Sequence, residues 1–300
     1  PKQLQRIGKN QTHRLIITIV KALRQWLYFL LYSNFFIAGV AVLMALETLL
    51  FAGSLERTTP YLPFLFFSTL CSYSFHYYFT ESSGPPTFRT KWLAQHKKLL
   101  VILFLGGLTG LAIFSFRLKE ELIWVLPAAI ATFLYSAPLL PHPLFRKLRK
   151  IAYGKTIFLA LIWTYASTVL PVICSQQHWT PALSVFTAAR YFFVYCICIL
   201  FDIRDREQDR AIGVKSLVTY LSDRNTGRLF WFSWLIALAL TGYLSQMDVS
   251  QSAILFQLIP LILLAFLYRP ARKQASDLLY YVVLDGLMAL SAVLTLFARI

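Results

Sequence analysis

The sequence predicts an all-α integral membrane protein with nine transmembrane helices. Hydrophobic residues make up 58% of the 300 residues, charged residues only 14%, and the mean hydropathy is +0.60. Soluble domains carry about a quarter of their residues as charges. The apolar residues also gather in runs near the ~20 residues that cross a bilayer core. Basic residues gather in the short segments between these runs, as in membrane proteins.

Nine apolar runs are candidate spans, in the order of the chain. They cover residues 26–52, 61–79, 98–116, 121–140, 154–174, 182–200, 229–246, 252–268 and 278–298. In the preceding segment, 1–25, six Lys and Arg residues alternate with apolar residues at helical spacing. This pattern predicts a basic amphipathic helix that lies on an anionic membrane surface. We therefore expect two parts, the amphipathic helix 1–25 and one membrane domain over 26–300.

The basic residues also predict the orientation of the chain. Of the 29 Lys and Arg residues, 24 lie in the N-terminal segment and in every second loop, whereas four lie in the other loops and at the C-terminus. Because basic loops stay on the cytoplasmic side, we expect a cytoplasmic N-terminus and an outside C-terminus in the cell (cytoplasmic or inner) membrane. The net charge of +16 is thereby explained without a nucleic-acid partner.

We expect neither a cleavable signal peptide nor cysteines that form disulfides or bind a metal. The first apolar run is too long for a cleavable signal and lacks a small-residue cleavage site. The four cysteines lie in or beside apolar runs, and the spacing of Cys196 and Cys198 does not suit zinc. We interpret all four as small core residues.

An aspartate-rich segment follows the sixth span and reads FDIRDREQDRAIGVKSL over residues 201–217. In a helix, Asp202, Asp205 and Asp209 fall within roughly 60° of one another. Three carboxylates on one face repel each other unless a cation lies over them, and Mg²⁺ shared with substrate phosphates suits such oxygen ligands. The segment therefore predicts a magnesium–diphosphate site on the cytoplasmic side. The alternative is a charged loop in which Asp and Arg residues form ion pairs.

Basic residues of the same segment can take the remaining phosphate charge. They are Arg206, Arg210 and Lys215. Gly213 allows the chain to leave the helix and turn.

The aspartate motif resembles that of the UbiA superfamily of intramembrane prenyltransferases. Asp202, Asp205, Asp209, Gly213 and Lys215 match its second motif, and Tyr135-Ser136 is similar to the Tyr-Ser element at the end of span 4. The resemblance implies a ring of helices around a lateral cavity open to lipid. It also implies that an isoprenyl diphosphate binds through Mg²⁺ and that the prenyl group passes to an aromatic or lipophilic acceptor. The catalytic residues would be the three aspartates and Tyr135.

The segment that carries the first aspartate motif in this family differs here. It runs from Ser72 to Glu81, contains His76 and has no aspartate. Arg89 and Lys91 follow, and together with His76 we count them among the residues that bind the diphosphate. Leu139 also stands where the family places a lysine after the Tyr-Ser element. A second hypothesis follows from these differences: a protein of the same fold that binds a polyprenyl or quinone lipid without transferring it.

A polar side chain within a membrane span costs free energy, so polar residues within the predicted spans indicate a water-filled interior of the helix bundle. We expect Asn34, Arg190 and Asp285 to face the cavity, and Arg190 to pair with Asp285 or Glu47. Glu47 could instead extend to the membrane surface from the end of its span. Buried charges also occur in secondary transporters, the third hypothesis, but those proteins show paired broken helices at the membrane midplane.

Overall fold

The computed structural model describes residues 2–53, 59–80, 88–136, 154–211, 216–273 and 276–298, and within these ranges it contains no strand. The predicted all-α fold is confirmed. The described helices up to residue 136 are α1 (Lys2–Tyr32), α2 (Phe35–Phe51), α3 (Tyr61–Phe79), α4 (Phe88–Gln95), α5 (Lys97–Arg117) and α6 (Leu122–Ser136). From residue 155 onward they are α8 (Lys155–Thr164), η3 (Tyr165–Val169), α9 (Leu170–Cys174), α10 (Pro181–Ala211), α11 (Leu217–Tyr220), α12 (Asp223–Tyr243), η4 (Leu244–Gln246), α13 (Gln251–Arg272), η5 (Leu279–Leu284) and α14 (Asp285–Phe297).

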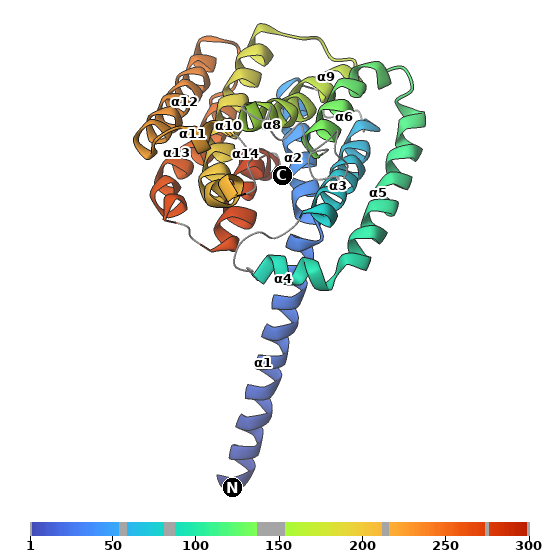
Figure 1. Ribbon diagram of the computed structural model, residues 1–300, viewed down its shortest axis with the longest axis vertical. Coiled ribbons are helices and arrows are strands. Elements are labelled where there is room, and N and C mark those ends of the chain that lie inside the picture. The colour runs from blue at the N-terminus through green and yellow to red at the C-terminus, as the bar shows by residue number, and fades with distance from the viewer. Residues whose placement is uncertain are drawn as a thin grey trace.

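The N-terminal part differs from the prediction in its boundaries. Helix α1 continues through residue 25 to Tyr32, so the predicted amphipathic helix and the start of the first span form one helix that projects from the bundle (Figure 1). The chain then bends by 61° before α2. Asn34 lies at the bend with a φ of 68°, a left-handed conformation that asparagine tolerates better than most residues. The candidate span predicted over 26–52 is therefore two helices joined by a bend, which together can still form one span.

Most of the other spans are found where they were predicted. Helix α3 has the predicted bounds 61–79, and α5, at Lys97–Arg117, extends the predicted 98–116 by one residue at each end. Helix α10 continues eleven residues beyond the predicted end at 200. Within the described residues, six helices are long and apolar enough to cross a membrane, or seven if the bent α1–α2 pair counts as one span. These findings support a multi-pass membrane protein, whereas the number nine stays a prediction.

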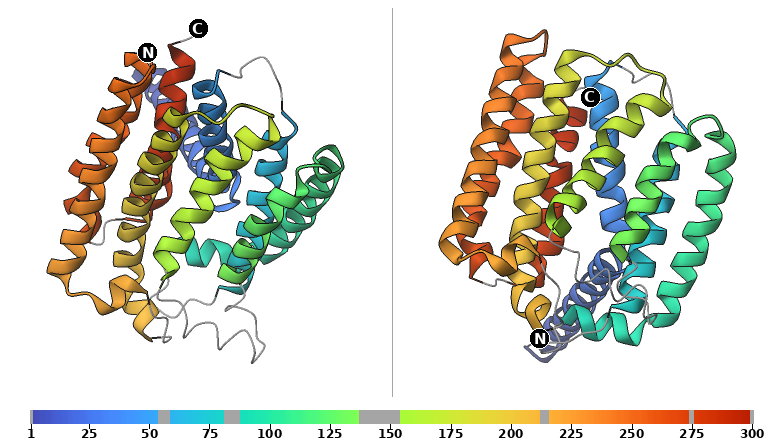
Figure 2. Two further views of the ribbon diagram at one scale, coloured as in Figure 1. Left: turned by 90° about the horizontal axis from the view of Figure 1, so that it is seen from above. Right: turned by 45° about the horizontal axis from the view of Figure 1, so that its top comes forward.

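The helices form a ring, which Figures 1 and 2 show from three directions. Neighbours in contact follow one another from α2 to α3, α6, α8, α10, α12, α13 and α14, and α14 packs back against α2. Helix α5 lies outside the ring against α3. An added Cβ at Gly107 would lie 2.9 Å from the backbone nitrogen of Cys71, so this close packing of α5 on α3 requires glycine.

Candidate functional site

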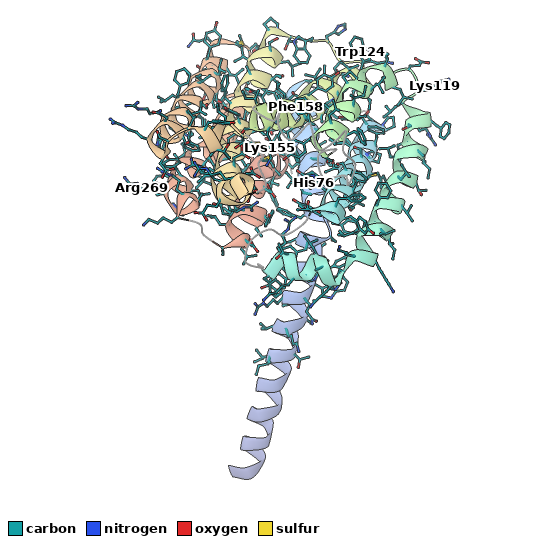
Figure 3. All side chains as sticks on the ribbon, in the orientation of Figure 1. His76, Lys119, Trp124, Lys155, Phe158 and Arg269 are labelled. Carbon is teal, nitrogen blue, oxygen red and sulfur yellow. The ribbon has the colours of Figure 1, made fainter. Side chains whose placement is uncertain are left out.

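The ends of several helices meet at one end of the ring and bring polar side chains together. They are the last turns of α3, α6 and α10, the first turn of α8, and the start of η5. Helix α10 remains regular through Asp209, as the spacing of the aspartates predicted. Figure 3 shows the labelled His76 and Lys155 toward the middle of the ring and Lys119 and Arg269 at its periphery.

Asp202 and Asp209 are buried, and both lie near the same lysine, Lys155. The ammonium of Lys155 lies 3.2 Å from Oδ2 of Asp209 and attracts Asp202 and Asp205 electrostatically. The hydroxyl of Thr156 donates a hydrogen bond to Asp202. Burial raises the pKa of Asp209 above its ordinary value, although the ammonium of Lys155 opposes this rise. One lysine therefore compensates these carboxylates only in part, which favours a further cation beside them.

Asp205 has a different partner from the other two aspartates. Arg204 holds its carboxylate with two hydrogen bonds, of 2.7 Å from Nε and 3.0 Å from Nη2. The guanidinium of Arg204 also lies over the rings of Phe201, Tyr280 and Tyr281. The side chain of Asp205 is 34% exposed, whereas that of Asp209 is 8% exposed. The three aspartates thus share a helix face but not one environment.

Aromatic and imidazole rings line the interior beside the aspartates. His76 stacks on Tyr135 with ring centroids 5.6 Å apart, and its Nδ1 lies 3.2 Å from Oγ of Ser136. Tyr73 lies between Tyr77 and Trp163, with centroid distances of 5.9 and 6.3 Å. The structure therefore places His76 and Tyr135 together, and both lie near Lys155.

Arg89 is buried between two tyrosine rings, whereas Lys91 on the same short helix is exposed. The guanidinium carbon of Arg89 lies 3.9 Å from the ring centroids of both Tyr77 and Tyr281. Its Nη1 donates a 2.8 Å hydrogen bond to the hydroxyl of Tyr281. Arg89 therefore joins α4 to α3 and η5 at the edge of the site, and Lys91 faces outward.

The two arginines that follow the aspartates bind neighbouring helices. Arg206 pairs with Asp223 and donates to Thr226 of α12, while Nη2 of Arg210 donates to the carbonyl of Thr219. A phosphate-binding role for these arginines stays a prediction. Gly213 and Lys215 lie outside the described residues.

Two of the predicted cavity residues, Asn34 and Asp285, line a hollow beside Arg89. Nδ2 of Asn34 donates a 3.3 Å hydrogen bond to Ser74. The third, Arg190, lies elsewhere and pairs with Glu47, the second of its two predicted partners. Glu47 is 4% exposed and also accepts a 2.8 Å hydrogen bond from Ser291, so it does not extend to the surface.

The aspartates of α10 can supply part of the ligand shell of one magnesium ion. Among the described residues, no group of three or more His, Cys, Asp or Glu side chains is arranged to hold a metal. Mg²⁺, however, needs only one or two carboxylates when substrate phosphates and water complete its shell. Asp202 and Asp209 provide such oxygens, and the ammonium of Lys155 already lies beside them as a cation. The donor chemistry therefore fits a shared ion.

Four residues of the site were not predicted from the sequence. They are Lys155, Thr156, Arg204 and Tyr281. Lys155 and Arg204 lie in the basic segments from which the orientation of the chain in the membrane was predicted. The packing of α8 on α10 brings Lys155 close to the aspartates. No local sequence pattern predicts this contact. Arg204 carried a weak signal because it lies between two aspartates of the motif.

A profile of the UbiA prenyltransferase family matches residues 93–284, which include the aspartates of α10, Lys155 and Tyr281. The chain belongs to the UbiA prenyltransferase family. A search of curated proteins and one of solved structures found no match. The part matched by the UbiA profile begins after the segment 72–81, where the first aspartate motif was missing.

Proposed function

We propose that this UbiA protein is a magnesium-assisted prenyltransferase. It moves an isoprenyl group from an allylic diphosphate to an aromatic or lipophilic acceptor. The observation that carries the proposal is the pair of buried aspartates, Asp202 and Asp209, beside Lys155 and an interior lined by aromatic rings. Membership of the UbiA family supports a membrane prenyltransferase at the family level.

Diphosphate binding would rest on the cationic side chains at the end of the ring. Lys155 lies beside Asp202 and Asp209, and Arg204 lies beside Asp205. When bound, Mg²⁺ held by these carboxylates would neutralise charge on the diphosphate. Lys155 also supplies a cation near Tyr135.

In the transfer step, the bond between the allylic carbon and the diphosphate oxygen breaks, and its electron pair leaves on the diphosphate. An electron pair of the acceptor forms the new bond to that carbon, and the acceptor then loses a proton to the released diphosphate. Positive charge on the allylic chain is attracted by aromatic faces. Tyr73, Tyr77 and Trp163 provide such faces.

A transfer assay on the purified protein in detergent tests this proposal. Radiolabelled geranyl, farnesyl and longer diphosphates are offered with a pooled extract of quinone precursors and lipids, in Mg²⁺ or in EDTA. We expect labelled lipid only in Mg²⁺, and none from the double variant Asp202→Asn/Asp209→Asn. Asp248→Asn is the matched control, because Asp248 is exposed in the loop after η4, at the other end of α12. Equal product from the double variant would contradict the assignment.

A second candidate function is a UbiA-fold protein that binds a prenyl lipid without transfer. The observation that favours it is the absence of aspartate from segment 72–81, where His76 stacks on Tyr135 instead. Under this alternative, the labelled diphosphate binds in Mg²⁺ and is released unchanged. The same assay, read for bound and converted label, distinguishes the two functions.

A further inference from the structure

Exposed basic side chains gather where the start of α12 meets the end of α13. We call this surface the basic corner, and its members are Arg224, Arg228, Arg269, Arg272 and Lys273. A Cβ added at Gly227 would lie 2.7 Å from the hydroxyl of Tyr268, and Tyr268 stacks on Phe230 with ring centroids 4.5 Å apart. These contacts hold the two helix ends side by side. The basic corner is therefore one surface, and Figure 3 shows its labelled Arg269 at the periphery of the ring.

The protein itself neutralises little of this charge. The acidic neighbour of the basic corner is Asp223, which pairs with Arg206 and lies 3.8 Å from Nη2 of Arg272. The other four cations form no ion pair with any residue that the structure describes: Arg224, Arg228, Arg269 and Lys273. Exposed guanidinium groups without a carboxylate are suited to bind a phosphate, since they match its geometry with paired N–H donors.

On α12, an apolar surface begins one helical turn from these cations. One face of the helix carries, at spacings of four, four and three residues, Arg224, Arg228, Phe232 and Leu235. Phe232 is 64% exposed and Leu235 is 55% exposed. Trp231, which is also exposed, lies at the boundary between the charged and the apolar part, where tryptophan is typical of a membrane–water interface.

Helix α13 repeats this arrangement in the opposite chain direction. One of its faces carries, at spacings of four, three and four residues, Ile262, Phe266, Arg269 and Lys273. Phe266 is 75% exposed and Ile262 is 45% exposed. Going away from the basic corner, both helices therefore present two cations and then two large apolar side chains.

The order of these side chains fixes their position in a membrane. Helices α12 and α13 are both candidate spans, and they pack against each other as antiparallel neighbours. Their exposed apolar side chains then face the lipid chains, which places the basic corner at the level of the head groups. A ligand that matches the whole surface has an anionic head group joined to apolar chains. A free phosphate matches only the basic part.

We propose that the basic corner binds an anionic phospholipid, whose phosphate contacts Arg228 and Arg269 and whose acyl chains lie along Phe232 and Phe266. Juxtamembrane clusters of arginine and lysine attract anionic lipids in this way. The proposal does not depend on the transferase function, because none of these residues belongs to the aspartate site of α10.

The connection between α5 and α6 offers a matched control. Arg117 and Lys119 are exposed there, but Glu120 and Glu121 follow them directly, so this segment has no net charge. Figure 3 shows Lys119 and Arg269 far apart at the periphery of the ring. The variants Arg228→Gln/Arg269→Gln and Arg117→Gln/Lys119→Gln remove the same amount of positive charge from exposed positions.

Quenching of Trp231 fluorescence by brominated lipid tests the proposal at the basic corner itself. The full chain is reconstituted in phosphatidylcholine vesicles with a minor share of phosphatidylglycerol, and the bromine atoms are on the acyl chains of one lipid or the other. The signal of Trp231 is the difference between each protein and the same protein with Trp231→Phe. We expect brominated phosphatidylglycerol to quench as if enriched at least about fivefold, since each arginine near an anionic head group has an effect of this size.

The variants decide whether the enrichment arises from the basic corner. Arg228→Gln/Arg269→Gln should reduce quenching to the level expected from the share of phosphatidylglycerol, whereas Arg117→Gln/Lys119→Gln should leave the enrichment unchanged. Arg228→Lys/Arg269→Lys, which keeps the charge, should retain most of it. No enrichment in the parent protein, or an equal loss in both glutamine variants, would overturn the proposal.

A further arm of the experiment distinguishes the lipid from its phosphate. Inorganic phosphate at the concentration of phosphatidylglycerol should not reduce the enrichment, because it lacks the chains that contact Phe232 and Phe266. If inorganic phosphate abolishes the enrichment, the basic corner is a site for free phosphate and the lipid assignment is wrong.

Discussion

Two clusters of buried charge on the same helix differ in how completely they are paired. Arg190 and Asp202 are 12 residues apart on α10, which is about 18 Å along its axis at 1.5 Å per residue. Arg190 donates to Glu47 and to three oxygens from Met44, Thr48 and Ser167. Near Asp202, one lysine serves several carboxylates, and Asp285 has no partner among the described residues.

This difference separates charge that stabilises the bundle from charge that is kept for a ligand. A buried ion pair with every group hydrogen-bonded needs nothing further, and breaking it leaves an uncompensated charge. A cluster with incomplete pairing carries a desolvation penalty that a cation or a hydrogen-bond donor can relieve. Substitutions in the two clusters should therefore act on different measurements, the first on stability and the second on binding and turnover.

The largest effect is expected from Glu47→Gln. It leaves Arg190 charged and without its carboxylate, so the free energy of unfolding should fall by about 3–5 kcal/mol. Denaturant unfolding in detergent measures this change. Ser291→Ala is the matched control, because it removes one hydrogen bond to Glu47 and should cost about 1 kcal/mol. Equal stability of the two variants would show that the Arg190–Glu47 pair does not stabilise the bundle.

Single substitutions of the three aspartates should be unequal in their effect on transfer. Asp202→Asn and Asp209→Asn should each lower kcat by about 10²- to 10³-fold, as the loss of charge stabilisation does in other active sites. Asp205→Asn should lower it less, because Asp205 is more exposed and already paired with Arg204. Initial rates with labelled farnesyl diphosphate measure the series. Three equal losses would instead support one metal site shared by all three aspartates.

Lys155→Met should weaken the binding of farnesyl diphosphate by about ten- to a hundredfold, since a charged hydrogen-bond donor beside the phosphates is lost. Lys155→Arg, which keeps the charge, should restore most of the affinity. Calorimetry in Mg²⁺ gives both values. An unchanged affinity of the methionine variant would mean that Lys155 only neutralises Asp209.

The smallest effect is expected at the rim of the site. Asp223 pairs with Arg206, but its side chain is 69% exposed. Asp223→Asn should therefore change the free energy of unfolding by less than about 1 kcal/mol and leave transfer unchanged. A large loss of activity would show that Arg206 must be held in place to bind the diphosphate.

The sequence predicted those features that depend on local pattern. Apolar runs placed α3 and α5 within a residue of their bounds, and the spacing of Asp202, Asp205 and Asp209 predicted their common helix face. Both signals arise within one helix, where hydropathy and the 3.6-residue period act directly.

Features that depend on contacts between helices were not predictable in this way. In the sequence, Lys155 belongs to a basic segment that indicates only the orientation of the chain, yet α8 packs on α10 and brings Lys155 to Asp209. The bend at Asn34 was missed because the run is long and apolar overall, although the polar pair Ser33-Asn34 marks a local break in it. The close contact of α5 with α3 did carry a signal, because Gly106 and Gly110 have the small-xxx-small spacing that often marks close helix contacts in membranes, and Gly110 packs against Phe67 of α3.

The most direct test of the account is the binding of farnesyl diphosphate to the parent protein and to Asp202→Asn/Asp209→Asn, in Mg²⁺ and in EDTA. If the partly paired carboxylates hold a shared cation, the parent binds more tightly in Mg²⁺ than in EDTA, and the double variant shows no such difference. If both proteins bind the diphosphate equally well in both buffers, the buried aspartates of α10 are structural and the proposed site is wrong.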